Sequence, residues 1–513
     1  MSLELVGRAA GHADRIALDT PEGTFTYEDL LGASAEAANR ILAGRHDLDG
    51  ARVCFLVTPG WPYVVTQWAI WRAGGVAVPM AVSHPPAELA YVLDDAEPDV
   101  VVADPALLDR IDGLAAERGL TLLTTSELAE PPGPLPSVSP DRPAMMHYTS
   151  GTTGRPKGVV TTHANIQAQV DSLVEAWGWR EDDHILLHLP LHHVHGIVNV
   201  LTCALWSGAR CEMMPRFDPV EVWERLARGH LTLYMAVPTI YRRLIEAWEG
   251  QDPGTQRRWS EGAGACRLMV SGSAALPVPT LERLESIPGQ RRLERDGMTE
   301  IGMGLSNPLH GERRPGHVGR PLPGVQIRLM GDDGAVLQGT GPEESSEAGE
   351  IQVRGPNVFG EYWRRPDATE EAFTEDGWFR TGDRAQVEEG AFRILGRSSV
   401  DILKTGGEKV SALEIEDVLR SHPAVRDCAV VGVPDEDWGD RVCAAVVLQE
   451  RDDASESMAG SARGTGPTPQ EFRAFLKERL APYKVPKDVL LVDDLPRNAM
   501  GKVTKPAVKE LFS

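Results

Sequence analysis

Short apolar runs alternate with amphipathic stretches along much of the chain. The apolar runs at 53–57 and 76–79 predict buried strands, and the segment 63–75 between them predicts a helix. The alternation returns at 231–237, an apolar run that leads into a helix opening at Pro238. Strands and helices that alternate in this way are typical of a doubly wound α/β domain with mostly parallel sheets.

The last part of the chain has a different pattern. Apolar residues at helical spacing cover 410–419, and two strand-like runs follow at 427–433 and 442–448. The segment 451–469 is polar and low in complexity, which predicts an exposed loop. An amphipathic helix is predicted at 470–480. We therefore expect an α/β protein with a large multi-sheet N-terminal domain and a small α+β C-terminal domain.

Composition narrows the class of protein. A chain of 513 residues is too long for one ordinary core, so two or more domains are expected. The formal charge of -23 argues against nucleic acid and anionic membranes as partners. A local cationic pocket can still bind an anion, because charges are screened beyond a Debye length of about 8 Å. We find no apolar run of about 18 residues, so no membrane span is expected.

The cysteines and the N-terminal residues indicate a compartment. The six cysteines form no CxxC pair, which favours reduced thiols in an intracellular protein. The N-terminal residues lack the apolar core of a signal peptide and the arginines of a transit peptide. We expect a cytoplasmic protein on these grounds. The cysteines are Cys54, Cys203, Cys211, Cys266, Cys428 and Cys443.

Residues 148–158, YTSGTTGRPKG, have the composition of a phosphate-binding loop. Glycines let backbone N–H groups approach an anion, hydroxyls add donors, and Lys157 adds positive charge. The Walker A spacing is not met, because Lys157 has neither a glycine before it nor a serine or threonine after it. The alternative is a polar surface loop. The small residues of the loop are Thr149, Ser150, Gly151, Thr152, Thr153 and Gly154.

Five histidines between 184 and 196 suggest a metal site at first sight. His188 and His192 have the i, i+4 spacing of metal ligands on a helix, but Pro190 between them breaks such a helix. An HExxH motif is absent from the sequence. We therefore favour a loop, HLPLHHVHG at 188–196, and expect most of the histidines to be surface or packed polar residues.

The loop at 148–158 resembles the signature loop of the adenylate-forming superfamily, which includes acyl-CoA synthetases, luciferases and peptide-synthetase adenylation domains. Four further motifs of that superfamily follow in the same order, and the resemblance runs from about Arg15 to Leu511. The motifs are ERDGMTE at 294–300, WFRTGD at 378–383, GRSSVD at 396–401 and PRNAMGK at 496–502.

The resemblance implies an ATP site built from these motifs. Lys157 and the loop amides would hold the β- and γ-phosphates, and Thr299 would contact the α-phosphate. Glu300, with Thr152, would hold Mg²⁺, which prefers carboxylate and phosphate oxygens. Asp383 would accept hydrogen bonds from the ribose hydroxyls. The remaining ATP-binding residues implied are Arg397 at the ribose or phosphate, and Ser273, Ala274, Ala275, Asp296 and Met298 around the base.

One position departs from the superfamily pattern. Asp296 stands where relatives usually have a tyrosine that stacks on adenine, and a carboxylate cannot stack. The Thr299–Glu300 pair that follows is intact. How the base is held in this chain is therefore left open.

The resemblance also implies two domains that move. Residues 1–397 would form the large domain, 398–401 the hinge and 402–513 the small domain. Lys502 of the small domain would bridge the substrate carboxylate and the α-phosphate during adenylation. The small domain would then rotate and present Gly406 and Gly407 to CoA, a domain-motion mechanism.

Within the superfamily, four strings resemble the malonyl-CoA synthetase branch: LPLHHVHG, AVPTIYRRL, LMVSGSAALP and ERDGMTEIGM. The first string resembles the substrate-gate motif of the superfamily, in which His195 would correspond to the aromatic residue or histidine that lines the acyl pocket and moves to admit the thiol. A dicarboxylate keeps a second charge that cannot be buried unpaired. Arg243 and Arg295, with Ser271 as a hydroxyl donor, are the expected partners of that charge. The alternative is that Arg295 pairs with an acidic neighbour in sequence and that Arg243 is solvated.

The implied activity is ligation of malonate or methylmalonate to CoA through an acyl-AMP, with ATP, Mg²⁺ and CoA as cofactor and co-substrates. A short- or medium-chain fatty acyl-CoA synthetase is one alternative. A stand-alone adenylation domain that loads a carrier protein is another, disfavoured because the sequence holds no carrier-like serine segment. A non-catalytic nucleotide-binding protein is disfavoured because Lys502 and Glu300 are both present.

Overall fold

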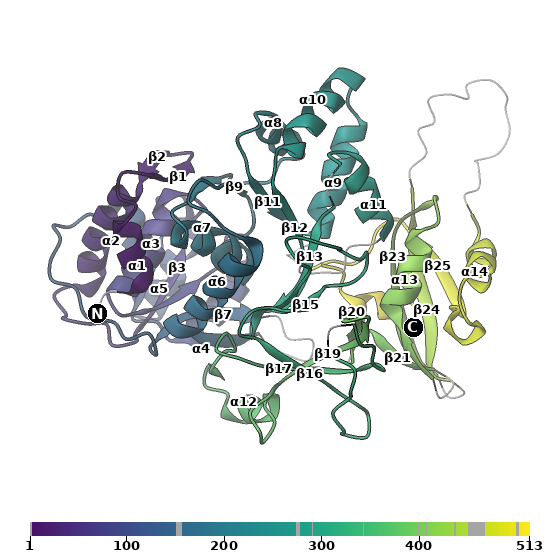
Figure 1. Ribbon diagram of the computed structural model, residues 1–513. Helices are drawn as coiled ribbons and strands as arrows, with labels where there is room; N and C mark the ends of the chain where they lie inside the picture. Colours follow the sequence, from purple (N-terminus) through teal and green to yellow (C-terminus); the bar gives the residue numbers. More distant parts are fainter. Residues whose placement is uncertain are drawn as a thin grey trace. The chain divides into compact units, whose positions relative to one another are not determined.

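The chain divides into two units in the computed structural model (Figure 1). Unit 1 comprises Met1–Leu276, Arg283–Ile327 and Gln352–Arg380, and unit 2 comprises Pro277–Glu282, Arg328–Ile351 and Thr381–Ser513. The structure describes residues 3–149, 156–272, 278–289, 291–341, 343–398, 400–405, 408–435, 438–449, 467–498 and 502–512.

One sheet of unit 1 has the order β15-β14-β13-β12-β11-β9-β10-β1-β2 over the described residues. The six strands from β13 to β1 run parallel, and the strands at both edges pair antiparallel. Its strands are β1 Ile16–Thr20, β2 Gly23–Thr26, β9 His184–Leu187, β10 Arg210–Met213, β11 Leu233–Ala236, β12 Leu268–Ser271, β13 Leu293–Met298, β14 Gly302–Ser306 and β15 Arg320–Pro321.

A second sheet of unit 1 has the order β18-β8-β7-β4-β3-β5-β6. Its strands β7, β4, β3, β5 and β6 are parallel, while β8 and β18 add an antiparallel edge. The strands are β3 Arg52–Leu56, β4 Val76–Pro79, β5 Val100–Ala103, β6 Thr121–Thr124, β7 Pro143–Thr149, β8 Lys157–Thr162 and β18 Glu361–Tyr362.

Local capping chemistry sets the ends of several helices of unit 1. In α6, Thr162 and Asn165 form a capping box and Gly178 ends the helix in the left-handed conformation. In α9, Pro238 occupies the first turn, where its missing N–H is not needed. The helices of unit 1 are α1 Glu4–Ala10, α2 Tyr27–Leu42, α3 Trp61–Arg72, α4 Pro86–Ala96, α5 Asp112–Glu117, α6 His163–Trp177, α7 Cys203–Trp206, α8 Pro219–Ala227, α9 Pro238–Glu249, α10 Pro253–Gly264 and α12 Pro366–Ala372, and α11 Val278–Ser286 is divided between the two units.

The histidine-rich segment contains a strand, a loop and a helix. His184–Leu187 form the buried parallel strand β9, and His195–Thr202 form a π-helix, η3, in which every residue is buried. The loop predicted over 188–196 therefore gives way to a helix at His195. His184, His188 and His195 are each less than a tenth exposed, so they are packed polar residues rather than surface ones.

The sheet formed by β21 to β25 lies in unit 2 and buries apolar side chains on both of its faces (Figure 1). Alternate residues of β23 and β24 face two separate apolar clusters. One cluster includes Ile415 of α13 and Phe472 of α14, and the other includes Val508 of α15, so helices cover both faces. The elements are β21 Ile402–Thr405, β22 Glu408–Ser411, β23 Val425–Asp435, β24 Gly439–Leu448, β25 Asp488–Val492, α13 Ala412–Arg420, α14 Pro469–Lys477 and α15 Lys505–Glu510.

A further sheet has the order β16-β17-β19-β20, with most of its residues in unit 2. The long hairpin of β19 and β20 carries the WFRTGD and GRSSVD motifs on neighbouring strands. The strands are β16 Gln326–Met330, β17 Gly349–Arg354, β19 Phe379–Glu388 and β20 Ala391–Arg397.

All six cysteines are buried free thiols. Burial raises the pKa of each of these thiols, which lowers the fraction present as reactive thiolate. Among the described helices, none has both the length and the apolar character needed to cross a membrane.

Candidate active site

Lys157 and Glu300, both in unit 1, contact the same tyrosine, Tyr362. Lys157 opens β8, and its Nζ lies 4.7 Å from the centroid of the Tyr362 ring. The hydroxyl of Tyr362 donates a hydrogen bond to Oε1 of Glu300 at 3.0 Å. Tyr362 reaches this place because β18 pairs with β8, opposite Val159. The predicted phosphate lysine and the predicted metal carboxylate are therefore neighbours of the same ring.

A backbone hydrogen bond also fixes the position of Glu300. Its carbonyl accepts a hydrogen bond from the N–H of Phe359 at 2.8 Å, and its side chain is buried. The preceding residue, Thr299, lines a small cavity together with Val194 and Val198. The Thr299–Glu300 pair thus lies between the histidine-rich segment and the β18 region.

Arg295 is a buried cation on β13. It is 3% exposed, and burial lowers its pKa to about 10 although the charge of Asp296 acts in the opposite direction. A Cβ added at Gly272 would lie 2.5 Å from Cζ of Arg295, so the guanidinium packs directly on the backbone after β12. Ser271, the last residue of β12, is buried and pairs in register with Glu294. Only glycine at 272 leaves room for this arrangement.

His195 lies close enough to Arg295 to be affected by its charge. Burial, followed by the charge of Arg295 and those of His188 and His193, holds the pKa of His195 well below its usual value. The imidazole is therefore neutral near pH 7. A neutral ring beside a buried guanidinium suits the wall of an acyl pocket better than a second cation would.

Arg243 occupies a different surface. It is exposed on α9, and its guanidinium lies 4.7 Å from the centroid of the Phe217 ring. Phe217 in turn contacts His188, with ring centroids 5.3 Å apart, and Nε2 of His188 lies 2.8 Å from the Tyr234 hydroxyl. The structure brings Ser271, Arg295 and His195 together, whereas Arg243 is connected to them through Phe217 and His188.

The candidate ribose residues of unit 2 form an ion pair. Nε of Arg397 lies 2.9 Å from Oδ1 of Asp383, and the two residues face each other in the register of β19 and β20. Burial raises the pKa of Asp383, and the charge of Arg397 opposes this rise. This ion pair joins the WFRTGD and GRSSVD motifs, which the resemblance assigns to ribose and phosphate binding.

Lys502 is exposed in unit 2, and its backbone is hydrogen-bonded to Asn498. The N–H of Asn498 donates to the carbonyl of Lys502 at 2.9 Å, and the N–H of Lys502 donates to Oδ1 of Asn498 at 3.0 Å. An isolated antiparallel β-bridge joins Arg497 and Val503. These contacts hold the backbone of Lys502 against Asn498.

Asp401, the last residue of the predicted hinge, is held by Lys505. Nζ of Lys505 lies 2.6 Å from Oδ1 of Asp401 and 2.8 Å from Oε1 of Glu416. The other oxygen of Asp401 accepts a hydrogen bond from the N–H of Arg397 at 3.1 Å. Asp401 therefore connects the strand before the hinge to the helices after it.

Several predicted residues lie outside the described part of the chain: Ser150, Gly151, Thr152, Thr153, Gly154, Ser273, Ala274, Ala275, Gly406 and Gly407. Of the residues that flank them, Thr149 pairs in register with Lys157, and Met298 ends β13 opposite Gly302. Asp296, which is on β13 like Met298, pairs in register with Leu305 of β14. The roles assigned to all these positions stay predictions.

Sequence reasoning missed two residues that the structure places beside predicted ones. Tyr362 contacts both Lys157 and Glu300, and Lys505 pairs with Asp401. Tyr362 lies on a two-residue strand, which has no periodicity to detect. Lys505 follows Lys502 closely and carries the same charge, so nothing in the sequence alone distinguished their roles.

Two family models match this chain. The AMP-binding enzyme model matches residues 5–363, and the AMP-binding enzyme C-terminal domain model matches residues 414–502. The chain belongs to the AMP-binding enzyme family. The predicted membership of the adenylate-forming superfamily is confirmed, and so is the α/β class with a large multi-sheet part and a small C-terminal domain. The boundaries of the large domain, hinge and small domain stay predictions.

Individual relatives within this family cover nearly the whole chain. The mitochondrial malonate–CoA ligase of Xenopus laevis is 45% identical over 97% of this chain and 90% of its own length. The ATP-bound crystal structure of MatB from Rhodopseudomonas palustris is similar with a TM-score of 0.87 and 35% identity, covering 100% of this chain and 99% of that one.

A third relative is a malonyl-CoA ligase in a ternary product complex with methylmalonyl-CoA and AMP. It is similar with a TM-score of 0.69 and 38% identity, covering 96% of this chain and 100% of that one. The name of the Xenopus laevis protein assigns that relative to mitochondria. The cytoplasmic location expected for this chain therefore stays a prediction.

Proposed function

We propose that this chain is an ATP-dependent acid–CoA ligase that activates malonate as malonyl-AMP and transfers the malonyl group to CoA. Family membership supports the adenylate-forming chemistry, and the names of the relatives support malonate as the acid. In this chain, the buried position of Arg295 is the observation that best supports malonate as the acid. It supplies a buried positive charge beside His195, where an acyl group is expected.

The buried guanidinium favours a dicarboxylate for an electrostatic reason. Malonate keeps one carboxylate after the other is activated, and that charge needs a hydrogen-bonded cation when it is buried. Arg295 and the hydroxyl of Ser271 come from adjacent strands at the carboxyl end of the sheet, where ligands bind in α/β proteins. A monocarboxylate would replace the charged partner with a methyl group, and sites of this kind reject such analogues by roughly 10⁴-fold.

In the first half-reaction, a carboxylate oxygen of malonate attacks the α-phosphorus of ATP and pyrophosphate leaves. Both reactants are anions, so the protein must supply positive charge where they meet. Lys157 would contact the departing phosphates from the start of β8, and Lys502 would neutralise charge between the carboxylate and the α-phosphate. Thr299 would donate its hydroxyl to the same phosphate.

Mg²⁺ fits the carboxylate of Glu300. Hard cations prefer carboxylate and phosphate oxygens, and the hydrogen bond from Tyr362 to Oε1 fixes the orientation of this carboxylate. The ion would neutralise phosphate charge when it is bound. Thr152 remains a second proposed ligand.

In the second half-reaction, the thiol sulfur of CoA attacks the acyl carbon and AMP leaves with the bonding electrons. Asp383 would hold the ribose hydroxyls of AMP, with Arg397 paired beside it. His195 would border the path of the thiol, and Gly406 and Gly407 would face it after rotation about 398–401. A neutral His195 does not compete with Arg295 for the free carboxylate of the malonyl group.

Pyrophosphate release tests this proposal most directly. We expect release from ATP and malonate with Mg²⁺, faster turnover when CoA is added, and malonyl-CoA as the product. Methylmalonate is assayed in parallel, because one relative holds methylmalonyl-CoA. Acetate, butyrate and octanoate serve as monocarboxylate controls. If butyrate or octanoate is activated as well as malonate, a short- or medium-chain acyl-CoA synthetase replaces the proposal.

A further inference from the structure

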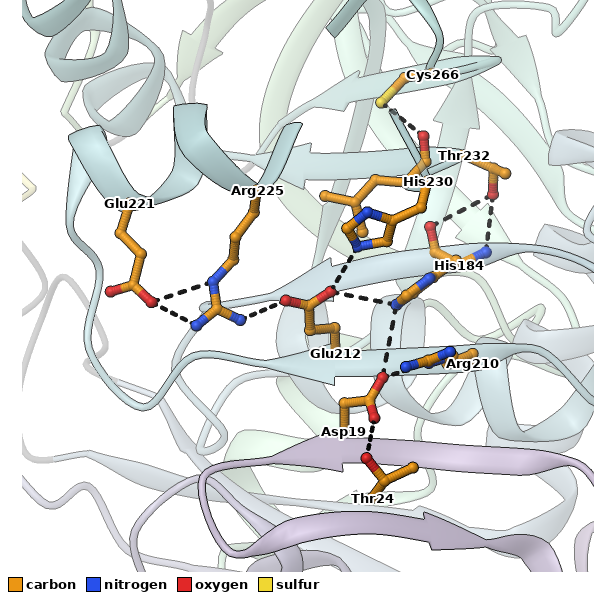
Figure 2. A network of polar contacts seen from close by, with 11 residues as sticks. Asp19, Thr24, His184, Arg210, Glu212, Glu221, Arg225, His230, Thr232 and Cys266 are labelled. Carbon is orange, nitrogen blue, oxygen red and sulfur yellow. Dashed lines mark hydrogen bonds and ion pairs between the residues drawn. The ribbon is translucent and has the colours of Figure 1, made fainter. Parts of the chain in front are cut away.

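Two imidazoles and one carboxylate converge inside the large sheet of unit 1 (Figure 2). Nε2 of His184 lies 3.3 Å from Oε2 of Glu212, and Nε2 of His230 lies 3.0 Å from the same oxygen. All three ligand atoms lie within 4.8 Å of one another. This cluster shares no residue with the ATP and acyl sites described above.

The spacing of these atoms is close to that of a metal site. Zinc binds imidazole nitrogen and carboxylate oxygen at about 2.0–2.2 Å, so neighbouring ligands of a tetrahedral ion lie roughly 3.3–3.5 Å apart. The two contacts with Glu212 are already near this value. A small rotation of the side chain of His230, which is 34% exposed, would bring the remaining pair into range.

The carboxylate is oriented by a partner on its far oxygen. Arg225 of α8 pairs with Oε1 of Glu212 and also with Glu221, as Figure 2 shows, so Oε2 remains directed at the imidazoles. Ligating carboxylates in metal sites are usually oriented by a further hydrogen-bond partner in this way.

Nearby charges do not oppose a cation here. Arg225 is balanced by Glu221, and Arg210 is paired with Asp19, whose Oδ2 lies 4.0 Å from Nε2 of His184. The side chains of His184 and Glu212 are each 10% exposed, so the site is largely dry. The half-exposed ring of His230 leaves a route from solvent.

The cluster also has a distinct place in the sheet. His184 begins β9, Glu212 lies in β10, and His230 precedes β11, so the three residues come from neighbouring parallel strands or their ends. The candidate acyl residue His195 lies beyond the opposite end of β9. An ion at the cluster would connect the start of β9, the middle of β10 and the segment before β11.

We propose that Nε2 of His184, Oε2 of Glu212 and Nε2 of His230 bind one divalent transition metal of the zinc class, with water as the fourth ligand. The role of the ion is structural, because it joins β9, β10 and the segment before β11 and contacts no residue assigned to ATP or to the acid. The competing interpretation is a metal-free network in which both imidazoles donate N–H groups to one carboxylate oxygen.

Metal titration of the full chain separates these two interpretations. Chelator-treated protein is titrated with Zn²⁺ against a chromophoric chelator, and then with Co²⁺, whose visible spectrum reports tetrahedral coordination. We expect one tight equivalent and a tetrahedral Co²⁺ spectrum. His230→Ala should weaken binding at least about tenfold and abolish the spectrum. Zn²⁺ should raise the Tm of the wild-type chain but not that of His230→Ala.

Two comparisons complete the test. His310→Ala removes an exposed histidine outside the cluster and should bind metal as the wild type does. Glu212→Gln should also lose the tight equivalent, and His230→Ala covers the case in which this buried variant fails to fold. The absence of a tight equivalent would overturn the proposal. Equal affinity in His230→Ala would also overturn it, because the metal would then be bound elsewhere, for example at the adjacent rings of His192 and His193.

Discussion

The hydroxyl of Tyr362 donates a hydrogen bond to Oε1 of Glu300, and the face of the same ring lies against Nζ of Lys157. One side chain thus contacts both a proposed phosphate ligand and the proposed metal ligand. Its hydroxyl orients the carboxylate, and its ring attracts the ammonium group through a cation–π contact. Tyr362 therefore acts as a positioning residue that sets two proposed contacts of ATP at once.

Tyr362→Phe should lower kcat/KM for ATP by roughly 10- to 100-fold, because hydrogen bonds to charged groups contribute about 1.5–3 kcal/mol. The phenylalanine keeps the ring that faces Lys157, so the loss reports the hydroxyl alone. ATP–pyrophosphate exchange at varied ATP and Mg²⁺ measures it, and the Mg²⁺ concentration for half-maximal rate should rise. Tyr483→Phe, at a partly exposed tyrosine, is the control. Unchanged Mg²⁺ dependence would contradict the positioning role.

Arg295→Ala should reduce the preference for malonate over acetate by roughly 10- to 100-fold. The variant deletes the buried cation beside His195, and a bidentate contact with a carboxylate contributes about 1.5–3 kcal/mol. kcat/KM for malonate should therefore fall roughly 10- to 100-fold, while that for acetate changes little.

Arg243→Ala provides the comparison for this prediction. Arg243 is exposed and contacts Phe217 rather than the strand that carries Arg295, so we expect a smaller fall for malonate. Initial rates with each acid at saturating ATP give both values. If Arg295→Ala lowers the rates for malonate and acetate equally, Arg295 does not recognise the second carboxylate.

Lys502→Ala should separate the two half-reactions. Adenylation needs a cation between two anions, whereas attack of the thiol on malonyl-AMP does not need this lysine. Pyrophosphate release should fall severely, and thioester formation from supplied malonyl-AMP should be nearly unchanged. Stopped-flow assays of each half-reaction provide the measurement. Equal loss in both, in a folded variant, would contradict the two-orientation mechanism.

Asp296→Tyr should tighten ATP binding. A tyrosine would provide the stacking face that relatives have at this position, contributing about 0.5–1.5 kcal/mol. Calorimetric titration with a non-hydrolysable ATP analogue measures the change, and Asp296→Asn controls for loss of the charge next to Arg295. Weaker binding by the tyrosine variant would indicate that another residue already covers the base.

Lys505→Met should destabilise the α13 and α15 region by about 3–5 kcal/mol, because it removes the buried cation between Asp401 and Glu416, although Glu416 keeps its ion pair with Arg420. Burial lowers the pKa of Lys505, but the charges of Glu416 and Asp401 outweigh it and raise the pKa above the usual value of 10.5. The stabilisation is therefore fully present below about pH 10.5 and is lost as the pH rises through the higher folded value.

Hydrogen exchange of residues 412–420 measures this effect at neutral pH, and the difference between variant and wild type should shrink in unfolding experiments at more alkaline pH. Lys477→Met removes an exposed lysine and is the matched control. A pH-independent difference would show that Lys505 stabilises the region by packing rather than by charge.

Local chemistry accounts for the parts of the fold that sequence reasoning predicted. The strand at Val76–Pro79 is a continuous apolar run because both of its faces are buried, and α9 begins at Pro238 because proline suits a first turn. The site motifs were recognised because each is a contiguous string. The predicted loop at 188–196 was wrong for its last two residues, because the buried helix η3 begins at His195.

Long-range pairings account for what was missed. Tyr362 reaches Glu300 only through the pairing of β18 with β8, and His230 reaches His184 only through the order of β11 and β9. Lys505 reaches Asp401 through the packing of α15 on the sheet of unit 2. Such contacts depend on topology, and no local period or motif spacing encodes them.

The burial of every native thiol makes the proposed rotation directly measurable. Thiol-reactive dyes or spin labels require an exposed thiolate, so they should ignore the six native cysteines and attach only where a cysteine is introduced. Exposed positions such as Arg257 in unit 1 and Lys477 in unit 2 offer one attachment point on each part. The distance between the two labels then reports how the two units move relative to each other at each stage of turnover.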